Sequence, residues 1–127
     1  MKKNELQENL NVIKLELETE VPEEDILAVE SKLNKLSTLM GLSAETLKHA
    51  KKIVLERQKI IFSMADKNMS PTMFKYYLEG EMADELSLYT YADRLNAALV
   101  HCSDSLRTII SKYKEELRLS NYVTNNQ

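Results

Sequence analysis

Residues that make turns and cross-links are scarce in this chain. Its 127 residues include 2 Gly, 2 Pro, 1 Cys and no Trp. Because tight turns depend on Gly and Pro, this scarcity excludes a sheet fold with many turns. The single cysteine, Cys102, has no partner for an internal disulfide, so nothing indicates an oxidising compartment. A chain of this length buries enough surface to fold without a metal or a disulfide.

Long apolar runs are also missing. Hydrophobic residues make up 43% of the chain, but no run approaches the roughly 18 residues that span a bilayer. The basic start at Lys2 and Lys3 lacks the apolar segment of a signal peptide. We therefore expect a cytoplasmic protein with no membrane role. A net charge of −3 argues against a protein that coats nucleic acid through its overall field.

What the chain has in abundance is apolar residues at helical spacing. Leu, Glu, Lys and Ala dominate, which is typical of an all-α protein. We predict one domain over residues 1–120, a helical bundle of four to five helices with a long C-terminal helix, and a disordered tail over 121–127. The expected helices cover 4–20, 22–40, 43–67, 71–79 and 81–120. Within the first, residues 13–18 also alternate like a strand, but the composition favours a helix.

Five short signals place the helix ends. Pro22 suits the first turn of a helix, and Gly41 is a natural stop for that helix. Ser43 is then a good N-cap for the next one. Ser70 followed by Pro71 predicts another start, and Gly80 predicts a bend before the long C-terminal helix.

One apolar stripe runs along the long C-terminal helix, at alternating spacings of four and three. Its members are Leu88, Ala92, Leu95, Leu99, Cys102, Leu106, Ile109 and Tyr113. The helix would be on the order of 60 Å long, more than a compact bundle of this mass can cover. We therefore expect a homo-oligomer or another protein partner, with an interface that includes Leu88, Leu95, Leu99, Leu106, Ile109 and Tyr113.

Basic residues concentrate in the middle of the chain. Residues 44–68 carry 6 basic and 3 acidic side chains, whereas the flanking segments are acidic. Lysine and arginine neutralise phosphates, so the candidates for nucleic-acid contact are Lys48, Lys51, Lys52, Arg57 and Lys59. An ordinary solvated face with i,i+4 ion pairs explains the same pattern, and the small excess of charge favours it. Lys75 beside Tyr76 and Tyr77 adds a basic and aromatic cluster of the kind that stacks bases.

Residues for catalysis or for a cofactor are few. Gly41 and Gly80 stand alone, so there is no phosphate-binding loop, and no spacing suits a metal site or a small-molecule substrate. Cys102 lies on the apolar stripe and points away from His101, which predicts a core residue. Arg94 and His101 share a helical face with a spacing that resembles the HEPN family of all-α ribonucleases. A solvated face is the favoured interpretation, and we expect no enzyme and no cofactor.

The second half of the chain resembles the single-strand-binding recombination mediators of T4-type phages, the UvsY family. The likeness covers about residues 45–115, in the order of a basic helix, a short polar break and a long helix. It lies in Met73-Phe-Lys-Tyr76, in Glu81-Met82 and in Cys102-Ser-Asp-Ser-Leu106 followed by Ile109 and Ser111. The resemblance implies a ring-forming helical oligomer that binds single-stranded DNA and helps to load a recombinase. It implies no catalysis.

Overall fold

The computed structural model describes residues 1–65 and 68–125 as four helices and no strand. These are α1 (Lys3–Glu18), α2 (Ile26–Met64), α3 (Pro71–Glu81) and α4 (Ala83–Asn125). The prediction of an all-α bundle with a long C-terminal helix is confirmed. The helix expected over 4–20 is also confirmed, since residues 13–18 have no strand to pair with.

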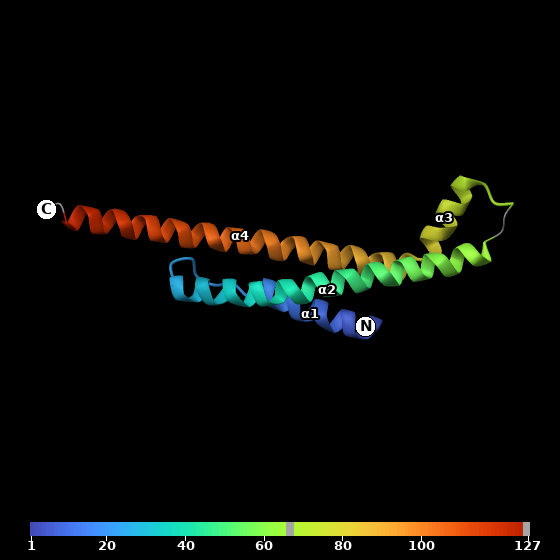
Figure 1. The fold of residues 1–127 in the computed structure, drawn as a ribbon, viewed down its shortest axis with the longest axis horizontal. Coiled ribbons are helices and arrows are strands. Elements are labelled where there is room, and N and C mark those ends of the chain that lie inside the picture. Colours follow the sequence, from blue (N-terminus) through green and yellow to red (C-terminus); the bar gives the residue numbers. More distant parts are fainter. Residues whose placement is uncertain (66–67, 126–127) are drawn as a thin grey trace.

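The body of the molecule is an antiparallel pair, α2 and α4, with α1 packed along it (Figure 1). α3 lies at the end where α2 finishes and α4 begins. At the other end, α4 continues well beyond the start of α2, and the C-terminal part projects alone. The molecule is therefore elongated, and its two ends present different elements.

The core is a seam of two apolar clusters where α1, α2 and α4 meet. One cluster contains Ile13, Val29, Leu36, Leu99 and Leu106, and the other contains Leu6, Leu10, Ala50 and Ala92. Full burial of a leucine or isoleucine side chain stabilises a fold by about 1.5–3 kcal/mol. α1 contributes the buried Leu6, Leu10 and Ile13, at the helical spacing of four and three.

The helix stop predicted at Gly41 is wrong. α2 runs through this residue without a break, and its backbone has no positive φ. The apolar residues on both sides of Gly41 pack against the same partner, α4, and this packing outweighs the roughly 1 kcal/mol that glycine costs inside a helix. Ser43, predicted to be an N-cap, is instead buried, and its hydroxyl donates to Asn96 Oδ1 at 2.9 Å.

The other helix ends lie closer to their predicted positions. α2 begins after Asp25, whose carboxylate accepts from Ala28 N–H at 3.1 Å, so Pro22 precedes the helix instead of opening it. α3 begins as predicted, with the Ser70 hydroxyl accepting from Met73 N–H at 3.2 Å. The predicted bend falls at Met82, between α3 and α4. Residues 121–125, expected in the tail, are helical; 126–127 lie outside the described residues.

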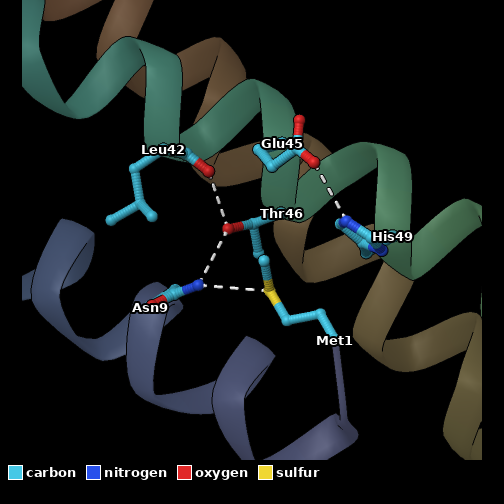
Figure 2. A network of polar contacts seen from close by, with 6 residues as sticks. All are labelled: Met1, Asn9, Leu42, Glu45, Thr46 and His49. Atoms are coloured by element: carbon cyan, nitrogen blue, oxygen red, sulfur yellow. Dashed lines mark hydrogen bonds and ion pairs between the residues drawn. The ribbon is translucent and has the colours of Figure 1, made fainter.

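A polar network fixes the position of α1 on α2 (Figure 2). Asn9 Nδ2 of α1 donates to Thr46 Oγ1 at 3.4 Å and to Met1 Sδ at 3.3 Å. Thr46 is fully buried, and its hydroxyl donates to Leu42 O at 2.7 Å within α2. Because every buried polar group of this network has a partner, the network favours one register of α1 against α2.

Two lysine side chains, one near each end of α1, hold this helix in place. Near its start, Lys3 Nζ lies 3.1 Å from Glu85 Oε1 in the first turn of α4. Burial raises the pKa of Glu85, but the hydrogen bonds from its own backbone N–H and from Lys3 lower it more, and the net pKa is below the ordinary value. At its end, Lys32 of α2 is buried, and its ammonium donates to the carbonyls of Glu16 and Thr19. A lysine thus caps α1 from another helix.

Candidate binding surfaces

Four lysines of α2 form one exposed face, which we call the lysine face. It consists of Lys48, Lys51, Lys52 and Lys59. Successive positions on a helix turn by 100°, so these four residues fall within one third of the circumference. Lys52 has an ion pair within the chain, to Glu56 at 4.0 Å. The other three have none within the described residues, which leaves their charges directed to solvent.

Arg57, the fifth basic candidate, lies on the opposite side of α2. It is half-buried against the junction of α3 and α4, and its Nη2 atom is 3.7 Å from Glu81 Oε2. Arg57 comes nine positions after Lys48. At 100° per residue this spacing is two and a half helical turns, so the two side chains point in opposite directions. The structure therefore brings together four of the five predicted basic residues and assigns the fifth to an intramolecular contact.

Apolar side chains share the lysine face. Leu55 and Phe62 are both 53% exposed, and they follow Lys48 at intervals of seven residues. The Phe62 ring packs against Phe74 of α3, with centroids 5.1 Å apart and an angle of 40°. α3 adds Tyr76, which is 68% exposed. The sequence reasoning missed Leu55 and Phe62, although their seven-residue spacing was a readable signal.

The residues of the predicted interface stripe have two different environments. Leu99 and Leu106 are buried in the chain's own core, and Leu88, Leu95 and Ile109 are half-buried beside it. Tyr113 is exposed. α1 and α2 thus cover the stripe up to Ile109, and the exposed part of the stripe begins after that residue.

Beyond Ile110, α4 extends past the other described helices, and only its first turns, at Lys112, Tyr113 and Glu116, line a cavity with Glu23 and Glu24 of the α1–α2 connector. Every residue of 111–125 is exposed, and we call this segment the α4 extension. At about 1.5 Å per residue it is roughly 22 Å long. Tyr113 and Leu117 continue the apolar stripe on it, and Glu115 pairs with Arg118 at 2.7 Å. The extension presents an apolar row that the described helices leave uncovered.

The residues weighed for catalysis are spread over the surface of α4. Arg94 and His101 are exposed, and neither side chain has an ion-pair or hydrogen-bond partner in the part of the chain that the structure describes. Cys102 is half-buried and packs against the core cluster. These positions place His101 and Cys102 on different sides of the helix.

The described residues hold neither a metal-ion site nor a membrane-spanning helix. No group of three or more His, Cys, Asp or Glu side chains is arranged to hold a metal ion in 1–65 and 68–125. In the same ranges, none of the helices combines the length and the apolar character that a membrane span needs. Comparison with protein-family models, with curated proteins and with solved structures finds no match to this chain.

Proposed function

We propose that the protein is a non-catalytic binding protein whose lysine face contacts the phosphates of a single-stranded nucleic acid. The observation that carries this proposal is the grouping of four lysines on one exposed face of α2, in a chain that is acidic overall. Neutralising phosphates releases counterions, and this release supplies most sequence-independent affinity. A single strand is favoured because its bases are free to stack on exposed aromatic rings.

The aromatic residues at the end of the lysine face support a single strand as the ligand. Phe62 lies on the same face of α2, and the exposed Tyr76 is on the helix that packs against it. Stacking of a base on such a ring is worth about 1–3 kcal/mol. The face therefore offers cations for the backbone and rings for the bases.

The test is the salt dependence of oligonucleotide binding, measured by fluorescence anisotropy. Four phosphate contacts give a slope of log K against log salt of about −3, or a loss of about 50-fold in affinity between 50 and 200 mM salt. Reversing Lys48, Lys52 and Lys59 to Glu should abolish binding. The matched control reverses Lys2, Lys35 and Lys114, which are exposed elsewhere, and it should keep most of the affinity.

Four results would contradict this proposal. Binding that is insensitive to salt, or equally weakened by the control variant, would remove the lysine face as the site. An absence of oligonucleotide binding would leave a partner-binding helical accessory protein with no nucleic-acid role. Cleavage of RNA that disappears in His101→Ala would replace the proposal with the ribonuclease function.

We further propose that the α4 extension is where a protein partner binds. Its apolar row has no cover among the described helices, and exposed apolar helix faces of this kind bind other helices. The resemblance to phage recombination mediators makes a recombinase the first partner to test. A variant ending at Ile110 should bind oligonucleotide normally but fail to stimulate loading of a phage-type recombinase. Unchanged loading by this variant would rule out the extension as the contact.

A further inference from the structure

An apolar cavity of about 400 Å³ opens where α1 ends and α4 leaves the body, and we call it the connector groove. Its floor includes Leu17, Val21, Leu106 and Ile109. Glu20 and Glu23, both exposed, stand at its edge. The buried Lys32 ammonium also lines it, but the carbonyls at the end of α1 and the Glu16 carboxylate already engage this charge. The groove thus combines an apolar floor with an acidic rim.

The acidic rim is part of a larger charge asymmetry. Residues 16–30 contain seven acidic side chains and no lysine or arginine, whereas residues 48–59 contain five basic side chains and one acidic one. A second cavity on the same connector is lined by three glutamates, Glu23, Glu24 and Glu116, and by one lysine, Lys112, so a surface with an acidic excess reaches the base of the α4 extension. One end of the molecule is acidic, and the lysine face lies toward the other.

A single chain cannot bring these two surfaces together. Glu24 precedes α2, and Lys59 is near its other end. The intervening helix holds them roughly 50 Å apart at 1.5 Å per residue. α2 has no break at which it could fold back. Only a second molecule can pair the acidic groove with the lysine face.

We propose that the connector groove of one copy binds the lysine face of another copy. This inference rests on the proposed assignment of the lysine face as a binding surface and names a protein ligand for it. Leu55 and Phe62, two turns apart, would enter the apolar groove while the flanking lysines meet Glu20 and Glu23. This is the arrangement in which an amphipathic helix binds a groove through anchors at i and i+7.

Such a contact joins two different surfaces, so it repeats from copy to copy and forms a ring or a filament. It also uses the lysines that the proposed function assigns to nucleic acid. Self-association and oligonucleotide binding therefore compete for the same face. Added oligonucleotide reduces the assembly, and high salt weakens it as well.

The experiment is a charge swap on the full chain, followed by sedimentation velocity. The acid-reversed variant is Glu20→Lys, Glu23→Lys and Glu24→Lys, and the lysine-reversed variant is Lys48→Glu, Lys52→Glu and Lys59→Glu. Each alone should weaken self-association by at least about tenfold, because like charges then face each other. An equimolar mixture of the two should restore it, since each reversed surface meets its complement. Reversing Glu5, Glu8 and Asp93, which are exposed elsewhere, is the matched control.

Restoration in the mixture is the decisive result, because two misfolded variants would not rescue each other. A wild-type chain that stays monomeric at high concentration and low salt overturns the inference. So does an acid-reversed variant that assembles like the wild type, or a mixture that stays dissociated.

The same variants separate this inference from the proposed function. The acid-reversed variant should lose self-association but still bind oligonucleotide, because its lysine face is intact. A chain that self-associates with the swap pattern but binds no oligonucleotide would refute the nucleic-acid role and leave this contact standing. A chain that binds oligonucleotide but stays monomeric would refute this contact and leave the nucleic-acid role standing.

Discussion

Replacing the buried Lys32 by methionine should loosen α1 from the rest of the fold. Lys32 belongs to α2, but its ammonium donates to the carbonyls of Glu16 and Thr19 at the end of α1. Its Nζ atom also lies 3.8 Å from Glu16 Oε1. Methionine has a similar length and keeps the apolar contacts of the lysine stem, so the substitution removes mainly the charge and its hydrogen bonds.

The size of the effect follows from these contacts. A hydrogen bond to a charged group is worth about 1.5–3 kcal/mol, and a cation at the end of a helix adds about 0.3–1 kcal/mol. Two terms reduce the loss. Glu16 O keeps the Thr19 N–H at 3.3 Å, and methionine avoids the cost of burying an ammonium. We expect a net loss of about 2 kcal/mol in the free energy of unfolding, which lowers Tm by about 7 °C.

Chemical denaturation measures the free energy, and hydrogen exchange locates the change. Amides of α1 should lose protection while those of α2 and α4 near Leu36 and Leu99 keep it. The control is Lys35→Met, because Lys35 is exposed one turn away on α2 and has no ion pair within the described residues. It should change stability by no more than about 0.5 kcal/mol. A Lys32→Met protein as stable as the wild type would refute the cap.

Three more predictions test the fold. Gly41→Ala should stabilise the protein by about 0.5–1 kcal/mol in urea denaturation, because Gly41 is exposed and helical, and a Cβ added to it would point into open space; a loss would show that the glycine is required. Leu99→Ala should cost about 2–5 kcal/mol and Leu119→Ala almost nothing, since only Leu99 is buried. Because the pKa of Glu85 is lowered in the fold, its contribution is present above the unfolded pKa and is lost as pH falls through the folded one. In Glu85→Gln, the free energy of unfolding should therefore fall less steeply as the pH is lowered into the acid range. An unchanged pH dependence would contradict the pair with Lys3.

Local signals predicted the helices well where the chain marks its own ends. Ser70 and Pro71 define the start of α3 through a cap and a fixed φ, and neither depends on distant residues. Gly41 shows the limit of such signals. Its preference for a helix end is worth about 1 kcal/mol. Packing of α2 on α4 is worth more, and no local pattern reveals that packing.

The candidate binding surfaces were predictable in part. The four lysines and Arg57 are close in sequence, but a helical turn of 100° per residue already separates Arg57 from the rest. The sequence predicted the apolar stripe of α4 but not what packs against it. Periodicity alone does not tell whether Leu99 is covered by α2 or by another chain. The role of Lys32 needed the structure, since its acceptors are backbone carbonyls, and those carry no signature in the sequence.

The α4 extension differs from an isolated peptide of the same length. A free helix of about 15 residues is marginal in water, mainly because its first turn is costly to form. Here the buried part of α4 supplies that first turn, so the extension needs only to propagate. A partner that binds it therefore spends less free energy on ordering it.

The positions of the apolar residues on the extension indicate which of its turns would contribute most to binding a partner. Along the stripe, Tyr113 and Leu117 are followed by Ser120 and Thr124, so the row becomes polar toward the end of the helix. On this stripe, apolar contact is thus concentrated in the first two turns, whereas Leu119 and Val123 are exposed off the stripe in the later turns. The first two turns adjoin the cavity lined by Glu23, Glu24 and Tyr113. A partner that covers the extension will therefore also meet the acidic connector, and basic residues next to its apolar anchors will strengthen binding.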